Sequence, residues 1–181
     1  LPEIINCNKT NKTGICIVEC SRRGDGLYVK IEPKHVGDLI TLQIVCKEKR
    51  SCQNMNIISN EQAVELVNIL CYESYSCLEV NVTINAISDI NINLQCIESN
   101  ACEQLNIHIK NKDSESNLMA NITCYDEFSC DFMNIITGDT RNIFITMNIL
   151  SYSQDILINH AYWRNTILNC GNNEHQRFIR Y

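Results

Sequence analysis

Twelve cysteines are the residues of this sequence with the clearest capacity for chemistry, and most of them recur at a fixed spacing. Thiolate metal sites usually pair cysteines two to four residues apart, often with histidine. Only Cys16 and Cys20 approach that spacing. The cysteines therefore predict disulfide bonds, formed in an oxidising compartment. Four segments share the pattern of two cysteines with five residues between them: CKEKRSCQNMNI, CYESYSCLEVNV, CIESNACEQLNI and CYDEFSCDFMNI, beginning at Cys46, Cys71, Cys96 and Cys124.

These segments mark an internal repeat. The first cysteines of the four copies lie 25, 25 and 28 residues apart. A degenerate copy precedes them, with Cys20 as its first cysteine and Gly26 in place of the second. A cysteine-free copy follows near residues 150–159, and a partial copy begins at Cys170. Self-similarity at a period of roughly 20–50 residues is typical of solenoid architectures.

Apolar residues alternate with polar ones on both sides of each cysteine pair. Leu42 and Ile44 precede the first pair, and Met55 and Ile57 follow it. A period of two predicts strands with one buried face. The polar positions also form columns: Asn56, Asn81, Asn106 and Asn134 share one place in the repeat, and Asn68, Asn93 and Asn121 share another. Two of these asparagines lie in glycosylation sequons, so we expect both columns to face solvent.

Together these patterns predict an all-β fold, a parallel β-helix or β-solenoid of about six coils. Each coil has roughly 25 residues, and its corner carries a disulfide. Successive coils stack about 4.8 Å apart, so neighbouring coils supply the core that no single coil can form. We expect residues 1–19 to form an N-terminal arm or cap, 20–160 the solenoid repeats, and 161–181 a C-terminal cap or interface segment.

Two disulfide pairings are open for the corner cysteines. The first closes each corner on itself, and the second links neighbouring coils, because a spacing of about 4.8 Å lies within the usual Cα–Cα range of a disulfide. The first pairing joins Cys46 to Cys52, Cys71 to Cys77, Cys96 to Cys102 and Cys124 to Cys130.

Four cysteines outside the corners are candidates for unpaired or intermolecular roles: Cys7, Cys16, Cys20 and Cys170. Two of the three N-terminal cysteines can pair locally, which leaves one cysteine at each end of the chain. A bond from Cys170 of one molecule to an N-terminal cysteine of the next gives a covalent head-to-tail polymer. The alternatives are an N-terminal segment that folds back along the solenoid, or a free and buried Cys170.

Four sequons predict N-linked glycans at Asn8, Asn11, Asn81 and Asn121, which agrees with an extracellular, secreted protein. No apolar run approaches the length of a membrane span. The net charge is −6, the pI is about 5.2, and no basic stripe is visible, so nucleic acid is not an expected partner. Apart from the glycans, we expect no cofactor.

Catalytic residues are not predicted. Each histidine occupies a different place in the repeat, so no base with an orienting partner is indicated, and we expect no enzyme. One column of carboxylates follows the first cysteines by two residues, and stacked like charges favour a bound cation such as calcium. The alternative is a solvated turn with divergent side chains. This weak calcium candidate consists of Glu48, Glu73, Glu98 and Asp126.

The repeated cysteine-x5-cysteine corner, usually with serine before the second cysteine, resembles cysteine-bonded β-helix repeats in secreted proteins of protists and algae. This resemblance implies a subunit of an extracellular filament or coat. We therefore expect a structural extracellular glycoprotein that assembles head to tail into a filament, coat or appendage. The alternative is a cell-surface adhesin or carbohydrate-binding module that contacts extracellular glycans. A polysaccharide lyase or hydrolase is the function that the sequence favours least.

Overall fold

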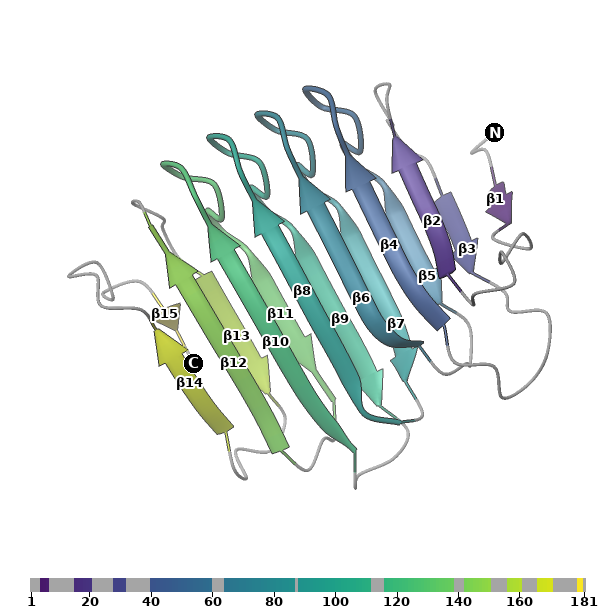
Figure 1. Cartoon of the computed structure of the whole chain (residues 1–181), viewed down its shortest axis with the longest axis vertical. Helices are drawn as coiled ribbons and strands as arrows, with labels where there is room; N and C mark the ends of the chain where they lie inside the picture. The colour runs from purple at the N-terminus through teal and green to yellow at the C-terminus, as the bar shows by residue number, and fades with distance from the viewer. Residues whose placement is uncertain are drawn as a thin grey trace.

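The computed structural model shows two parallel β-sheets that the chain visits alternately, one strand in each sheet for every coil (Figure 1). This confirms the all-β solenoid. The structure describes residues 4–6, 15–20, 28–31, 40–59, 64–86, 88–111, 116–138, 142–150, 156–160, 166–170 and 179–180. For the strands nearest the two ends it describes the backbone pairing. Every strand pair in both sheets is parallel, as stacking of successive coils requires.

Sheet A contains eight of the described strands. In spatial order they are β1 (Ile4–Asn6), β3 (Tyr28–Ile31), β5 (Asn56–Ser59), β7 (Asn81–Ala86), β9 (Asn106–Asn111), β11 (Asn134–Thr137), β13 (Ile156–His160) and β15 (Ile179–Arg180). Sheet B contains β2 (Ile15–Cys20), β4 (Ile40–Cys46), β6 (Val64–Cys71), β8 (Ile90–Cys96), β10 (Asn117–Cys124), β12 (Asn142–Ile149) and β14 (Thr166–Cys170), again in spatial order.

The number of coils is close to the predicted six. Four turns, about 25 residues apart, carry the full repeat with its disulfide. Strands without a corner disulfide continue both sheets at either end, to eight strands in sheet A and seven in sheet B among the described residues. Strand β1 and all of β2 except Cys20 come from residues 1–19, and β14 and β15 come from residues 161–181, so both terminal segments add strands to the sheets.

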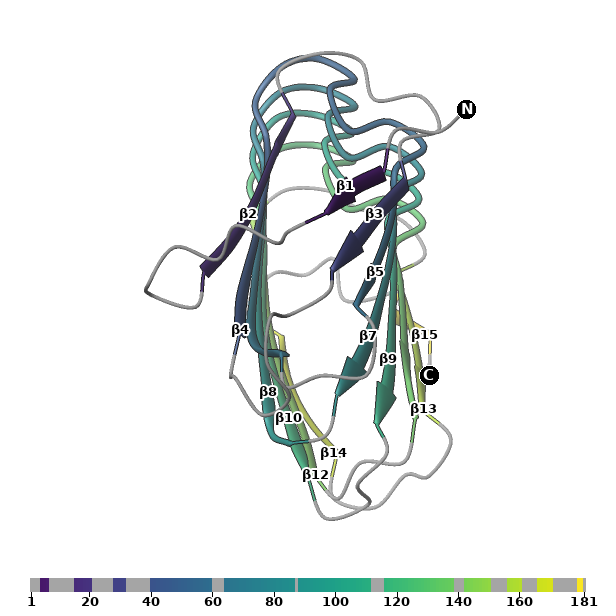
Figure 2. The ribbon, with the colours of Figure 1, turned by 90° about the vertical axis from the view of Figure 1, so that its right-hand side faces the viewer.

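The core lies between the two sheets, which face each other with the corners stacked along one edge (Figure 2). Alternation along each strand turns every second side chain inward. Leu42 and Ile44 are fully buried on β4, and their register partners Val67 and Ile69 are fully buried on β6. Each inward position thus forms a column of apolar side chains that runs along the solenoid, which is how neighbouring coils complete one another's core.

Each corner is built from three overlapping turns. In the first disulfide-bonded coil the N–H of Ser51 donates to the carbonyl of Glu48 at 2.9 Å, and the N–H of Met55 donates to that of Cys52 at 3.1 Å. The third residue of each of these two turns has a left-handed backbone, with φ near +60°. All four corners share this geometry, with the left-handed residues Arg50, Asn54, Tyr75, Glu79, Asn100, Gln104, Phe128 and Phe132.

The corners are also hydrogen-bonded to one another. The N–H of Cys52 donates to the carbonyl of Ser76 at 2.9 Å, and the N–H of Cys77 donates to that of Ala101 at 2.8 Å. The side-chain amide of Asn81 then donates to the carbonyl of the left-handed residue Glu79 at 3.2 Å, as Asn106 does in the next coil. One column of asparagines in the repeat therefore helps to hold the second turn of the corner.

A column of small residues is buried in the corner beside the second cysteine. Ser51, Ser76 and Ser129 are fully buried, and their hydroxyl oxygens make no hydrogen bond within the described part of the chain. Ala101 takes the same place in the remaining coil and is equally buried. A buried hydroxyl without a partner costs roughly 1–3 kcal/mol. The hydroxyl is therefore dispensable at this position.

We predict that Ser76→Ala raises the free energy of unfolding by about 1–2 kcal/mol, because it removes an unpaired buried hydroxyl without leaving a sizeable cavity. The matched change Ala101→Ser should lower it by a similar amount. Urea unfolding of the disulfide-intact proteins measures both values. A loss of stability in Ser76→Ala would show that the hydroxyl has a hydrogen-bond partner after all.

Candidate functional site

The corner cysteines pair within each coil. Disulfides join Cys46 to Cys52, Cys71 to Cys77, Cys96 to Cys102 and Cys124 to Cys130, with Cα–Cα distances of 5.7, 5.8, 5.7 and 5.9 Å. Of the two pairings that the spacing leaves open, the structure therefore has the one that closes each corner. All eight half-cystines are fully buried. Burial inside the corner suits a structural bond and not an accessible redox site.

The N-terminal cysteines differ from one another. Cys16 is disulfide-bonded, so it is not an unpaired cysteine. Cys20 is a free thiol that is buried, with its sulfur 3.7 Å from the sulfur of Met55. Burial raises the pKa of the Cys20 thiol, which disfavours the reactive thiolate. Cys7 lies outside the described residues.

The register of Cys170 bears on the predicted covalent link. Cys170 on β14 pairs with Met147 on β12. When register partners are followed from strand to strand across sheet B, this position reaches Val18 on β2, whereas the first cysteines of the repeats align with Cys20. If β2 of a second copy continued sheet B in this register, Cys170 would lie opposite Val18. The Cα atom of Cys170 would then be roughly 8 Å from the Cα atoms of Cys16 and Cys20, because the residues are one strand spacing apart across the sheet and two residues apart along the strand. That exceeds the reach of a disulfide, about 7 Å.

The acidic column does not form a metal site within the described residues. Glu48, Glu73 and Glu98 are exposed at successive corners, as is Asp126. No group of three or more His, Cys, Asp or Glu side chains in the described part of the chain is arranged to hold a metal ion. One Asp126 carboxylate oxygen accepts the N–H of Glu127 at 2.8 Å. The solvated turn is therefore the alternative that the geometry favours over the calcium candidate.

Among the histidines, His108 lies on the outer face of β9. Partial burial, followed by the nearby charge of Lys110, lowers the pKa of the His108 imidazole. Its register partners are Thr83 on β7 and Ile136 on β11, and neither is a carboxylate or a nucleophile poised for catalysis. On the described strands next to it, His108 therefore has no titratable register partner.

Two of the four sequons fall on described residues. Asn81 begins β7 in sheet A, and Asn121 lies in the middle of β10 in sheet B, and both side chains are exposed. The two sheets face each other across the core (Figure 2). The two exposed asparagines therefore project from opposite broad faces of the molecule. Asn8 and Asn11 lie outside the described residues.

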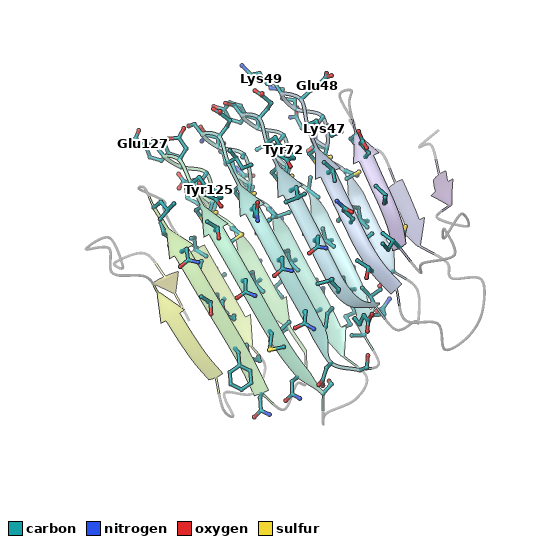
Figure 3. All side chains as sticks on the ribbon, in the orientation of Figure 1. Lys47, Glu48, Lys49, Tyr72, Tyr125 and Glu127 are labelled. Carbon is teal, nitrogen blue, oxygen red and sulfur yellow. A yellow bond between two sulfur atoms is a disulfide. The ribbon has the colours of Figure 1, made fainter. Side chains whose placement is uncertain are left out.

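The residues directly after the first cysteines, with Leu150 at the matching place in the cysteine-free coil, form a line along the edge between sheet B and the corners, where Figure 3 labels Tyr72 and Tyr125. We call Tyr72, Ile97, Tyr125 and Leu150 the corner ridge. The side chains of Tyr72, Tyr125 and Leu150 are 40%, 45% and 59% exposed. Their stacking is fixed by the backbone, since the N–H of each ridge residue donates to the carbonyl of the first cysteine in the preceding coil at 2.9–3.0 Å.

Lys47 precedes the ridge in the same column. Its ammonium group lies 2.6 Å from a carboxylate oxygen of Glu19 in the preceding coil. That hydrogen bond and the charge of Glu19 raise the pKa of Lys47. The shared position of Tyr72 and Tyr125 is visible in the sequence. The position of Leu150 in the ridge is not visible in the sequence, because its coil lacks the cysteines that would align it with the other copies.

Comparison of the chain with protein-family models, with curated proteins and with solved structures finds no match. The resemblance to secreted protist and algal proteins therefore remains a prediction. What the structure establishes is the class: a parallel β-solenoid with four disulfide-bonded corners. In its described part the chain has no helix with the length and apolarity that crossing a membrane requires.

We predict that Cys71→Ala/Cys77→Ala lowers the free energy of unfolding by about 2–4 kcal/mol. The small closed loop contributes about 2 kcal/mol on the chain-entropy model, and the removed sulfur atoms leave part of the corner unfilled. Denaturant unfolding of the double variant against the parent checks this. Equal stabilities would mean that hydrogen bonds between coils hold the corner without the disulfide.

Proposed function

We propose that this protein is an extracellular structural glycoprotein, a subunit that assembles end to end into a filament, coat or appendage. The observation that carries the proposal is the open edge at each end of sheet B. In the described residues β2 and β14 each have a strand partner on one side alone. Unpaired N–H and C=O groups on an edge strand invite another strand, and the parallel ladder needs no change of direction to continue into a second copy.

The placement of the sequons supports end-to-end contact over contact between broad faces. Glycans on Asn81 and Asn121 would project from sheet A and sheet B respectively. Bulky, hydrated glycans on both faces would oppose face-to-face packing of two solenoids. The other two sequons, at Asn8 and Asn11, fall in the sequence between β1 and β2, so this argument concerns the broad faces alone.

The corner disulfides support an extracellular location. Disulfides form and persist in oxidising compartments and are rare in the cytosol. A subunit of a coat or filament benefits from closed corners, because each disulfide limits the unfolded ensemble of its coil. Sequons, disulfides and a regular repeat are together the features expected of a durable secreted scaffold.

A substitution at the free edge of β2 tests the proposal. The carbonyl of Cys20 accepts a bond from Lys47, so Cys20 faces β4, and the backbone groups of Ile17 point to the opposite, open side. Ile17→Pro should therefore remove an edge N–H and leave the bonds between β2 and β4 intact. We expect the parent protein to form filaments by electron microscopy and Ile17→Pro to remain monomeric with an unchanged circular dichroism spectrum.

Ile17→Thr is the matched control, because it keeps the edge N–H and the strand propensity and should still assemble. A parent protein that stays monomeric at every concentration would remove the proposal. Filaments that persist in Ile17→Pro would show that assembly does not use the edge of β2. Electrophoresis with and without reductant then separates a covalent polymer through Cys170 from a non-covalent stack.

The corner ridge favours a second candidate function, that of an adhesin or carbohydrate-binding module. Tyr72 and Tyr125 lie two coils apart on one exposed edge, and aromatic faces are suited to the apolar face of a sugar ring. Acidic side chains next to the ridge, such as Glu73 and Asp126, would repel anionic polysaccharides. A neutral glycan is therefore the expected ligand for this function.

For that candidate we predict that Tyr72→Ala/Tyr125→Ala weakens binding to an insoluble neutral polysaccharide, cellulose or chitin, by roughly tenfold. Phe132→Ala is the control, because Phe132 is also exposed at a corner but lies outside the ridge. Pull-down with the two polysaccharides measures the effect. Absence of binding by the parent protein, or equal loss in the control, would exclude the ridge as a carbohydrate site.

A further inference from the structure

Two exposed apolar side chains are neighbours on the outer face of sheet B. Met119 on β10 and Phe144 on β12 are register partners, with 48% and 38% of their surface exposed. Two residues before them on the same strands, the side-chain amide of Asn142 donates to that of Asn117 at 2.6 Å. Two residues after them are Asn121 and its partner Thr146. Polar residues thus border the apolar pair on both sides along the strands.

Asn121 is held in a defined orientation by an amide ladder. The side-chain nitrogen of Asn93 donates to the side-chain oxygen of Asn68 at 3.0 Å, and that of Asn121 donates to Asn93 at 3.3 Å. A primary amide has two hydrogens, one anti and one syn to its own oxygen. In a ladder of translated amides the anti hydrogen points along the stack. The syn hydrogen of Asn121 therefore points away from the sheet.

We propose that Asn121 carries an N-linked glycan whose first N-acetylglucosamine residues cover Met119 and Phe144. This inference rests on the proposed function, specifically on its glycoprotein part. In the transfer, Nδ2 of Asn121 forms a bond to C1 of the sugar, the C1–O bond to a lipid diphosphate donor breaks, and Nδ2 loses one proton. The sugar takes the syn position, so the anti hydrogen and the bond to Asn93 are retained.

The distances along and between the strands allow a glycan on Asn121 to cover Met119 and Phe144. Asn121 and Met119 are two residues apart on one face, about 6.6 Å at the usual rise of a strand, and Phe144 lies one strand spacing beyond. A sugar ring offers an apolar face of C–H groups and an acetyl methyl group, which pack on aromatic and thioether side chains. A protein partner fits less well, since a stable interface buries roughly 800 Å² on each side and this pair is bordered along its strands by polar residues, with Ile167 on β14 as the next register partner of Phe144.

Asn81 supplies a natural control on the opposite face. Its register partners in sheet A are Asn56 and Asn106, and Thr83 follows it on the same face. No large hydrophobic side chain is exposed on the strands of sheet A for which side chains are described. A glycan on Asn81 therefore has less apolar surface to cover, since its neighbour Ile58 on β5 is only partly exposed.

Two substitutions remove one glycan each without altering the asparagines. Thr123→Val and Thr83→Val destroy the sequons of Asn121 and Asn81, and valine keeps the branched shape and strand propensity of threonine. In protein secreted from eukaryotic cells we expect Thr123→Val to bind more of a hydrophobic fluorescent dye and to lower Tm by about 2–4 °C, the shift for a modest loss in a chain of this size. Thr83→Val should change neither quantity.

Adding Phe144→Thr to Thr123→Val should remove the extra dye binding, because the exposed ring is then gone. Glycopeptide mapping of the parent reports occupancy directly. An unoccupied Asn121 beside an occupied Asn81 would overturn this inference and leave the glycoprotein proposal standing, whereas two unoccupied sites would overturn both. Occupancy at Asn121 with equal behaviour of the two valine variants would overturn the covering role. Filament formation in the Ile17→Pro comparison is independent of each of these outcomes.

Discussion

The backbone hydrogen-bond ladder between coils is the constraint on which the rest of this structure depends. It runs through both sheets and continues through the corner, where Cys52 bonds to Ser76 and Cys77 to Ala101. A continuous parallel ladder forces each residue to lie over its counterpart in the next coil. Stability then comes from each coil and from its contact with its neighbours, so the side chains stacked in each column must pack favourably on one another.

The corner shows how strictly the ladder constrains the chain. Two residues of each corner are left-handed, and they include Arg50, Tyr75 and Phe128, for which that conformation costs roughly 1–2 kcal/mol each. Glycine would avoid the cost, yet the chain has just 6 glycines. The disulfide, the stacked backbone bonds and the asparagine that bonds the second left-handed carbonyl offset it together. The cysteine pair and the asparagine column therefore stabilise the same corner conformation.

Much of the repeat unit follows from the sequence for this reason. Cysteine spacing identifies the corners, and alternation identifies which residues of β4 or β6 face inward, because stacking makes each column visible as a repeated residue type. The longer step between Cys96 and Cys124 is also explained. Its extra residues fall between β9 and β10, at the edge opposite the corners, where connection length is less constrained.

Features whose residue types do not recur from coil to coil could not be predicted from the sequence. Pairing of β2 and β14 into sheet B depends on long-range contacts, since neither strand belongs to a complete copy of the motif. The exposed neighbours Met119 and Phe144 carry no repeated signature, because their column holds Leu66 and Asn91 in the preceding coils. Likewise, the left-handed positions are occupied by residues of unrelated type. Tertiary stacking, not local preference, decides their conformation.

The two ends of the ladder are not equivalent, and this shapes how copies can join. At one end β14 and β15 complete a coil, but at the other β1 extends sheet A one strand beyond β3, and no strand of the described residues lies next to β2 on its outer side. If β15 of one copy paired with β1 of the next, β14 and β2 would lie two strand spacings apart, about 9.6 Å. Sheet B would then lack one strand at the junction. Continuous pairing of both sheets instead requires β1 to leave its place on β3 or β15 to leave its place on β13, so these two short terminal pairings are the natural control points of end-to-end assembly.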